Sequence, residues 1–237
     1  NDDGTVNRAA LPAIFNPEDL NALEMALQIK DEYGGKVTVI TMGLPNAAKI
    51  LREALYRGAD DAILVTDRKC AASDTLATSY ILSCAVKKLD FDILMCGRQA
   101  IDGDTAQVGP QIAEKLDLTQ ITYVESLSNL KDKKIQIRRN LGNGWQDVTT
   151  KLPVLLTVLG EANEPRVAAA KKMMKQKKAL TPIEVEKQLK AENPTAEHDE
   201  LSKMVEEKCN SLEEKGLLIR QWNLDFLEAD LEWCGRD

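Results

Sequence analysis

Catalytic side chains are scarce in this sequence of 237 residues. Its one histidine, His198, lies between Glu197 and Asp199 and is expected to be a solvated surface residue rather than a base. The sequence contains no Cys–His pair, no G-x-S-x-G elbow and no cluster with metal-ligand spacing. It also lacks the G-x-x-x-x-G-K-S/T phosphate loop and the G-x-G-x-x-G fingerprint. These absences argue against a hydrolase and favour a binding or carrier protein.

Long apolar runs, paired cysteines and a basic charge balance are also missing. No run approaches the roughly 20 apolar residues of a membrane helix, and no signal-peptide pattern opens the chain, so we expect a cytoplasmic protein without membrane insertion. A net charge of −7 argues against a nucleic-acid partner. The cysteines show no C-x-x-C spacing, and we expect free thiols in a reducing compartment. They are Cys70, Cys84, Cys96, Cys209 and Cys234.

Aromatic residues make up 4% of the chain, and the apolar weight lies in Ala, Leu, Ile and Val, as in helices layered on parallel strands. Asn16-Pro17-Glu18-Asp19 has the composition of a helix start. Strands then alternate with helices, which predicts a parallel α/β sheet. The predicted helices cover residues 16–33, 47–57, 74–89 and 107–116. The predicted strands cover residues 36–42, 62–65, 93–95, 121–124 and 152–159.

An antiparallel excursion interrupts this alternation between residues 125 and 150. Residues 134–139 alternate, residues 141–144 have the composition of a hairpin turn, and residues 145–149 are expected to pair back. The α/β domain is predicted to end near Gly160. This gives two regions, a nucleotide-binding domain over 1–160 and a helical C-terminal arm over 161–237.

The C-terminal region shows no strand–helix alternation. Its first part, residues 166–178, is basic and carries two methionines, which fits either a solvated face or an adaptable surface for a partner. Helices are predicted over residues 181–190 and 197–215. The second is highly charged with a thin apolar stripe, so we expect it to pack on a partner or to extend from the body.

Residues 97–110 form a glycine-bearing turn between a predicted strand and a predicted helix. The N–H groups of a first helical turn and its positive dipole end favour an anion. One interpretation is therefore that Asp104 to Val108 cradles the phosphates of a nucleotide. The other is an ordinary loop with an Asp or Thr cap. Asp102 and Asp104 alone provide no acid–base geometry.

The residues Cys96 to Pro110 resemble the signature loop of electron-transfer flavoprotein β subunits. The resemblance extends to Asn16–Asp19, Gly58–Asp60 and Asn163–Arg166. It implies an adenine-nucleotide α-hydrolase-like α/β domain with a C-terminal arm that wraps the α subunit. The family's first strand is not found here, and its tail after Cys-Gly is cut. The chain begins at Asn1 rather than at methionine, so we expect further sequence at both ends.

Within that family, the resemblance implies which residues bind the cofactor. Asn16 to Asp19 would line the adenosine side, Met42 would lie against the nucleotide, and the loop after residue 96 would cover it, with the N–H groups of Thr105 to Val108 on phosphate. The implied set is Asn16, Pro17, Glu18, Asp19, Met42, Gly97, Arg98, Gln99, Ala100, Ile101, Asp102, Gly103, Asp104, Thr105, Ala106, Gln107 and Val108.

The resemblance also implies a function. The version Asp102–Val108 is similar to bacterial and anaerobe members, among which bifurcating complexes are common, and the charged helix at 197–215 points the same way. We therefore expect FAD, with NADH as electron donor and electrons passing to ferredoxin or flavodoxin and to an acyl-CoA or similar dehydrogenase. That flavin-containing dehydrogenase would dock near Arg166 to Lys178. The alternatives are a non-bifurcating β subunit holding a structural AMP and a regulatory nucleotide-binding module.

Overall fold

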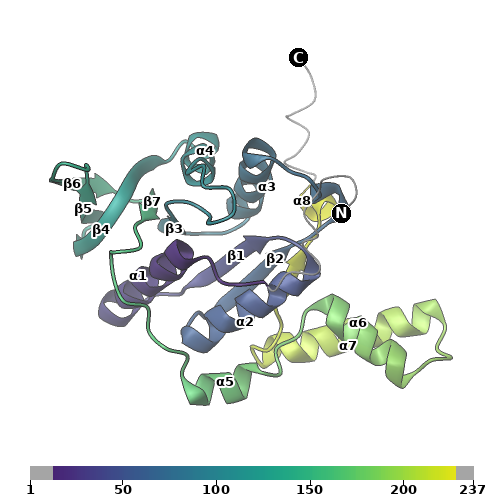
Figure 1. Cartoon of the computed structure of the whole chain (residues 1–237). Coiled ribbons are helices and arrows are strands. Elements are labelled where there is room, and N and C mark those ends of the chain that lie inside the picture. The colour runs from purple at the N-terminus through teal and green to yellow at the C-terminus, as the bar shows by residue number, and fades with distance from the viewer. Residues whose placement is uncertain (1–12, 228–237) are drawn as a thin grey trace.

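A computed structural model describes residues 13–227 of the chain. It confirms an α/β fold with a parallel-sheet core and a helical C-terminal region (Figure 1). The strands are β1 (Thr38–Met42), β2 (Asp61–Val65), β3 (Ile93–Gly97), β4 (Thr119–Lys131), β5 (Lys134–Asn140), β6 (Trp145–Lys151), β7 (Val154–Val158) and β8 (Arg220–Trp222).

Six of the helices lie where the sequence predicts them, whereas α5 and α8 were not predicted. Asp74 caps the third helix by accepting from the Ala77 N–H, and Thr181 and Glu184 form a reciprocal capping box on the sixth. The helices are α1 (Pro17–Tyr33), α2 (Ala48–Arg57), α3 (Thr75–Lys87), α4 (Val108–Lys115), α5 (Ala170–Gln176), α6 (Pro182–Glu192), α7 (His198–Glu214) and α8 (Leu224–Leu227). Two short 3-10 turns, η1 (Pro45–Ala47) and η2 (Arg68–Cys70), complete the elements.

The strands form two hydrogen-bonded sheets. One has the order β1-β2-β8 and is parallel throughout. The other has the order β3-β7-β4-β5-β6, parallel across its first three strands and antiparallel across its last three. Within the described residues, no hydrogen-bonded pairing joins β1 to β3, so the single sheet implied by simple alternation is divided.

The core is layered on both faces of the parallel strands. In β2, Leu64 packs with α1 and α2, whereas Ile63 and Val65 pack with α3 and with Trp222. In β7, Leu155 packs with α4, whereas Leu156 packs with α1. Strands covered on both faces are apolar throughout, which is why these runs show no alternation of apolar and polar residues.

Strand β4 is longer than the predicted 121–124 because it belongs to both parts of its sheet. Up to Val124 it pairs in parallel with β7, and from there it pairs antiparallel with β5. A bulge at Tyr123 (φ 60°) joins the two parts, with the Tyr123 N–H donating to Thr157 Oγ1 at 3.2 Å. The bulge interrupts the alternation of side chains between the two faces of the sheet. Sequence periodicity therefore predicts only the first part of β4.

The helical region leaves the body and returns to it. Helices α6 and α7 pack on each other as a hairpin that projects from the domain (Figure 1). A parallel bridge between Leu180 and Leu218 lies at its base. The chain then forms β8 beside β2, so a short strand lies in the region after Gly160 whose sequence shows no strand–helix alternation. Arg220–Trp222 contains one apolar side chain, so its sequence does not predict a strand. These residues form a strand because they pair with the open edge of β2.

Candidate functional site

The loop between β3 and α4 begins at an unusually close contact. A Cβ atom at Gly97 would lie 2.6 Å from the Asp19 nitrogen and 2.7 Å from the Glu18 carbonyl carbon, so only glycine fits there. A Cβ at Gly109, on α4, would lie 2.7 Å from the Cys96 sulfur. These two glycines let α1 and α4 approach β3 closely, and the loop between them is thereby positioned at the carboxyl end of the strand.

The first turn of α1 holds the first half of the loop. The backbone N–H groups of Gly97 and Gln99 donate to carboxylate oxygens of α1, and that of Ile101 donates to the amide oxygen of the N-cap residue Asn16. The Arg98 guanidinium forms an ion pair with Glu18 at 2.9 Å and lies over the Tyr123 ring. The structure therefore brings the predicted Asn16–Asp19 segment together with the predicted loop, and it does so through direct hydrogen bonds.

The second half of the loop presents free backbone donors. Among the described residues, the N–H groups of Thr105 to Gly109 have no hydrogen-bond partner. Helix α4 has no side-chain cap, so the structure does not show the Asp or Thr cap that the ordinary-loop interpretation includes. Asp104 and Ala106 both have positive φ, 50° and 55°, so the backbone is in the left-handed region at both residues. Free N–H groups at a helix start provide an anion site.

Helix α3 supports the same turn. Thr75, in its first turn, donates from Oγ1 to Gln107 Oε1 at 2.8 Å, and Gln107 immediately precedes α4. The sequence predicts only the start of a helix at Asp74. The capping pattern at Asp74 indicates where the helix begins. The hydrogen bond between Thr75 and Gln107 joins residues 32 apart, so no local sequence pattern indicates it.

Two partly buried acidic side chains in the site have raised pKa values. Burial raises the pKa of the Asp19 carboxyl, although hydrogen bonds from Gly97 and Asn16 oppose the shift. Burial, with a contribution from the Asp19 charge, raises the pKa of the Cys96 thiol to about 12. A raised pKa favours the neutral thiol over the nucleophilic thiolate.

The structure places Met42 differently from the loop residues. It ends β1, at the carboxyl edge of the other sheet, and packs partly buried against the cluster that contains Ile63 and Val65. None of the hydrogen bonds described here joins it to the loop. Ala100, Ile101, Asp102 and Gly103 lie in the exposed part of the loop.

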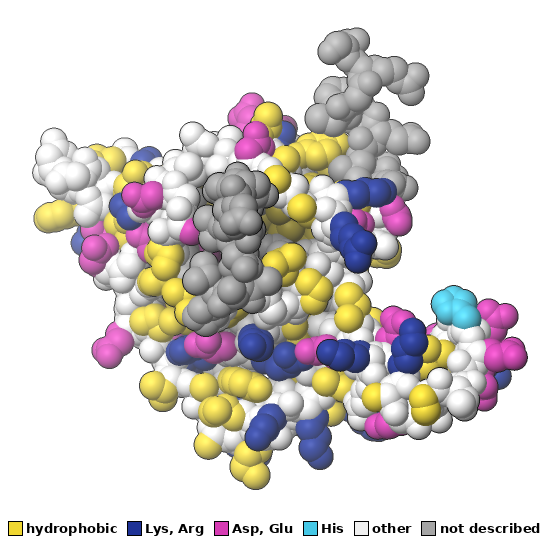
Figure 2. Space-filling model, turned by 45° about the vertical axis from the view of Figure 1, so that its right-hand side comes forward, with side chains coloured by type: hydrophobic (Ala, Val, Ile, Leu, Met, Phe, Trp, Pro, Cys, Tyr) yellow, Lys and Arg dark blue, Asp and Glu magenta, His cyan; other side chains and the backbone are white. Residues whose placement is uncertain are grey.

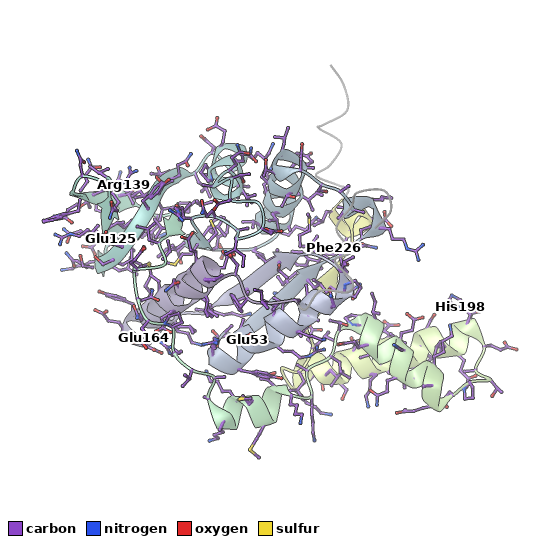
Figure 3. All side chains as sticks on the ribbon, viewed as in Figure 1. Glu53, Glu125, Arg139, Glu164, His198 and Phe226 are labelled. Carbon is purple, nitrogen blue, oxygen red and sulfur yellow. The ribbon has the colours of Figure 1, made fainter. Side chains whose placement is uncertain are left out.

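The segment after β7 is fixed to α1 and α2. Arg166 forms a double hydrogen bond with the buried Glu24 carboxylate, from Nε at 2.8 Å and from a terminal nitrogen at 3.0 Å, and an ion pair with Asp31. Asn21 and Asn163 exchange hydrogen bonds alongside. The hydrogen bonds of Arg166 lower the pKa of Glu24 in spite of its burial. Glu164, labelled in Figure 3, is an exposed residue of the same segment.

Beyond Arg166 the segment becomes a free surface. Val167 is 86% exposed and Met174 is 79% exposed, and the neighbouring lysines of α5 are exposed too. Figure 2 shows hydrophobic and basic side chains together at the lower end of the molecule, where α5 lies. Acidic side chains instead surround the exposed His198 at the far end of the α6–α7 hairpin, as expected for a solvated residue.

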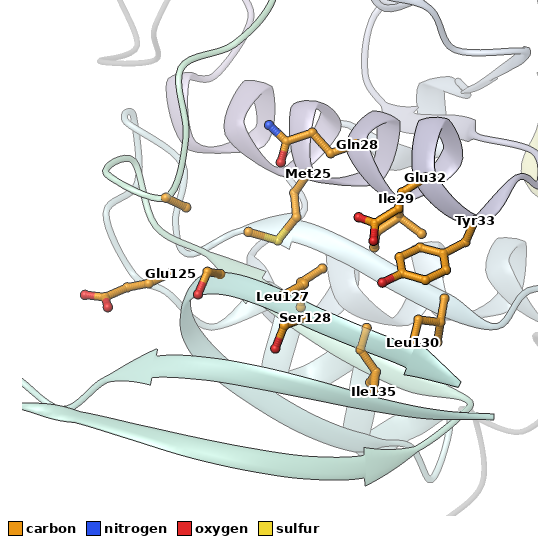
Figure 4. Close-up of a pocket in the computed structure, with 12 residues that line it drawn as sticks. Met25, Gln28, Ile29, Glu32, Tyr33, Glu125, Leu127, Ser128, Leu130 and Ile135 are labelled. Carbon is orange, nitrogen blue, oxygen red and sulfur yellow. The ribbon is translucent and has the colours of Figure 1, made fainter. Parts of the chain in front are cut away.

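A small pocket of about 120 Å³ lies between α1 and the antiparallel strands (Figure 4). Met25, Ile29, Leu127 and Ile135 form its apolar lining. None of the residues implied as cofactor-binding lines it, so this cavity is separate from the loop. Within the described residues, no helix has the length and apolar character needed to cross a membrane.

Comparison with known proteins gives a consistent result. Residues 3–188 match the family model described as electron transfer flavoprotein domain. The electron transfer flavoprotein subunit beta of Thermoanaerobacterium thermosaccharolyticum is 53% identical over 167 residues, 70% of this chain and 64% of that protein. The corresponding subunit of Clostridium acetobutylicum is 51% identical over 170 residues, 72% and 65% of the two chains.

A third relative is the acryloyl-CoA reductase electron transfer subunit gamma of Anaerotignum propionicum. It is 48% identical over 170 residues, which cover 70% of this chain and 63% of that protein. The matched part of the chain thus spans slightly less than two thirds of the length of these relatives.

Proposed function

Because this chain belongs to the electron transfer flavoprotein family and is similar to its β subunits, we propose that the turn before α4 holds the phosphates of an adenine-containing cofactor. The observation that carries this proposal is the set of backbone N–H groups from Thr105 to Val108 that have no hydrogen-bond partner among residues 13–227. Such donors suit phosphate oxygens. A Cβ at Gly103 would meet no other atom within 4 Å, so the backbone before the turn is open to a ligand.

We propose that the cofactor is FAD. Relatives whose names describe electron transfer subunits support a redox cofactor rather than a purely structural nucleotide. When bound, the flavin supplies the redox chemistry, and the protein contributes binding, orientation and electrostatics. The loop's own residues contribute in three ways: free N–H groups bind phosphate, Arg98 neutralises the Glu18 carboxylate beside the site, and α1 covers one side of the loop.

We propose further that the chain works as an electron carrier paired with an α subunit. NADH is the electron donor, and the two electrons separate toward ferredoxin or flavodoxin and toward an acyl-CoA or similar dehydrogenase. The similarity to a subunit of an acryloyl-CoA reductase supports a coenzyme A thioester as the substrate class of that dehydrogenase.

The dehydrogenase is proposed to dock on residues 166–178. Exposed methionine and valine side chains give adaptable apolar contact there, and the surrounding lysines favour an acidic partner. Arg166 anchors the start of this surface to the body through Glu24. Because Arg166 is held by Glu24, residues 166–178 keep a defined position relative to the loop after β3.

The nucleotide content of the native complex tests the cofactor. Two FAD per heterodimer supports the proposal, whereas one FAD with one AMP contradicts it in favour of a structural nucleotide. Absence of any nucleotide attributable to this chain contradicts the phosphate site itself. Stopped-flow reduction by NADH adds a second criterion, because a bound flavin on this chain that never changes redox state favours a regulatory module.

A further inference from the structure

Two arginines of helix α2 reach the two ends of the proposed docking segment, residues 166–178. The Arg57 guanidinium donates from Nη1 to the Arg166 carbonyl, where the segment begins. The Arg52 guanidinium donates from Nε to the Ala179 carbonyl at 2.8 Å, one residue after the segment ends. Helix α5, which lies within the segment, packs on α2 (Figure 1). The segment is therefore tied to a single helix at both ends.

Each arginine is itself held by a carboxylate, which fixes the direction of its guanidinium. Arg57 binds Glu53, one turn earlier on α2 and labelled in Figure 3, through Nε and Nη2. Arg52 forms an ion pair with Glu184 through Nη2. The side chains of Arg57 and Arg52 are only 16% and 15% exposed. A guanidinium carries five N–H donors in a fixed planar fork, so it can bind a carboxylate and a carbonyl at the same time.

The start of the segment has a second backbone contact with α2. The Ala169 N–H donates to the Tyr56 carbonyl at 3.1 Å. Tyr56 lies in the last turn of α2, where carbonyl groups have no partner inside the helix. The exposed Val167 lies between this contact and the Arg166 carbonyl, so a short stretch that is fixed at both ends presents it to solvent.

Helix α5 has little else to hold it in place. It has seven residues, no side-chain cap and no buried residue. Residues 171–178 contain five lysines and no acid, so their charges repel one another. A helix of this length is unstable in water by itself. The position of α5 therefore depends mainly on the contacts at the two ends of the segment.

We propose that Arg52 and Arg57 are positioning residues for docking. They hold both ends of residues 166–178 on α2, so that the exposed apolar and basic side chains meet the dehydrogenase in one fixed arrangement. Both act through the segment rather than by touching the partner. A surface that is already ordered loses less conformational entropy on binding, so the two arginines increase the affinity for the partner. This inference rests on the proposed docking surface.

Electron transfer from the NADH-reduced native complex to the dehydrogenase isolated with it tests the inference. In Arg57→Met and in Arg52→Met we expect the KM for the dehydrogenase to rise about threefold to tenfold, because docking is weakened. The kcat should stay nearly unchanged, since the transfer step itself is not altered. Methionine keeps an unbranched side chain and a high helix propensity. A lower kcat with the parent KM in both variants would overturn the inference.

Site-resolved amide hydrogen exchange of the same complexes, followed by mass spectrometry, shows whether each end of the segment is released. In Arg57→Met the Ala169 N–H should exchange about tenfold faster. In Arg52→Met the same increase is expected for the Leu180 N–H, which follows the Ala179 carbonyl and donates to Leu217. A raised KM with exchange at the parent rate in both variants would show that α2 does not hold the segment.

Arg220→Met is the matched control for charge and stability. Arg220 lies on β8 and forms a partly buried ion pair with Asp61, so this variant loses one positive charge and one ion pair away from the segment. Its KM and the exchange of residues 166–180 should match the parent. An equal rise of KM in this variant would indicate a general effect and contradict the positioning role.

A pair of variants at Glu53 covers a failure of Arg57→Met to fold. Glu53→Ala removes the carboxylate that directs Arg57, so it should raise the KM and accelerate exchange of the Ala169 N–H. Glu53→Gln should restore both, because its amide oxygen still accepts from the guanidinium. Equal values in the two variants would contradict the inference.

Charge reversal on α5 separates this inference from the docking surface on which it rests. If replacing Lys171, Lys172 and Lys175 by glutamate raises the KM but the arginine variants do not, the surface docks the partner and the positioning role is wrong. If none of these variants raises the KM, the proposed docking surface itself fails. The exchange rates then still decide whether α2 holds the segment.

Discussion

At the residue scale, the position of Asn16 was predicted correctly from the sequence, but the hydrogen-bond partners of its side chain were not. The sequence places Asn16 at the N-cap of α1, and the structure confirms that position. The Asn16 side chain does not cap the helix; it binds Gln99 and Ile101, 83 and 85 residues away. Nothing in residues 16–19 indicates that partner, because Asn, Pro, Glu and Asp are equally suited to an ordinary helix start.

Gly103→Val tests the open backbone at the proposed phosphate site. A side chain at this position meets no protein atom, so we expect the free energy of unfolding to change by less than about 0.5 kcal/mol. The nucleotide should bind at least about tenfold more weakly, since its approach to the backbone is blocked. Isothermal titration with FAD and with AMP measures the effect. Gly144→Val, at another position with open space, is the control and should bind normally.

Glu24→Gln tests the buried pair that fixes the docking segment. The hydrogen bonds of Arg166 hold the pKa of Glu24 below its usual value, so the ionised form stabilises the fold. At pH 7 we expect a loss of about 1 to 3 kcal/mol in the free energy of unfolding. This contribution is complete above the unfolded-state pKa near 4.3 and disappears as the pH falls through the lower folded-state pKa. Variant and parent should therefore converge in acid.

Urea unfolding at a series of pH values measures this difference. Glu164→Gln is the control, because the Glu164 side chain is exposed and makes no ion pair among the described residues. A constant difference between Glu24→Gln and the parent down to the most acidic pH would contradict the assignment.

At the element scale, local capping residues predict where most helices begin, whereas the extent of the strands depends on which strands pair with each other. The capping box at Thr181 and Glu184 was readable in the sequence, and α6 begins there. Strand β4 was only partly readable, since its second half depends on pairing with β5 and on the bulge at Tyr123. Helix α4 begins where predicted, but its lack of a side-chain cap is visible only in the structure.

The basic face of α5 is an element whose proposed role can be tested by charge reversal. Replacing Lys171, Lys172 and Lys175 by glutamate should weaken docking to an acidic dehydrogenase at low ionic strength. The difference from the parent should shrink at high salt, because exposed charges are screened. Electron-transfer rates to the partner dehydrogenase, measured against salt concentration, give the result.

The same number of reversals on the hairpin provides the control for net charge. Lys187, Lys203 and Lys208 lie on α6 and α7, away from α5, and their replacement by glutamate should leave docking unchanged. Equal loss in both triple variants would indicate a general charge effect. Unchanged transfer at low salt in the α5 variant would count against the docking surface.

At the scale of the whole molecule, the return of the chain to β2 decides the architecture. Residues 220–227 place Trp222 and Leu227 on the cluster formed by Ile63, Val65 and Ile81. The C-terminal region thus combines a projecting hairpin with a segment that completes the first sheet. Strands β2 and β8 are more than 150 residues apart, and their pairing depends on which edge the rest of the fold leaves open.

Trp222→Ala tests this closure. Trp222 is 8% exposed and packs against the Phe226 ring, so its removal should lower the free energy of unfolding by about 3 to 5 kcal/mol. Trp145, which is 66% exposed on β6, is the matched control, and Trp145→Ala should cost less than about 0.5 kcal/mol. Guanidinium unfolding measures both. Similar costs for the two variants would contradict the packing of β8 on the body.

The sequence by itself determined the α/β class, most helix boundaries and the resemblance of Cys96–Pro110 to a family loop. These depend on local caps, on apolar periodicity and on residue types in a fixed order. Only the tertiary structure decided that α1 binds alternate N–H groups of residues 97–101, that the strands divide into two sheets, and that Arg220–Trp222 is a strand. Each of these rests on contacts between residues distant in the chain. Their free energy is gained only when other elements have brought the partners together, so no local pattern records it.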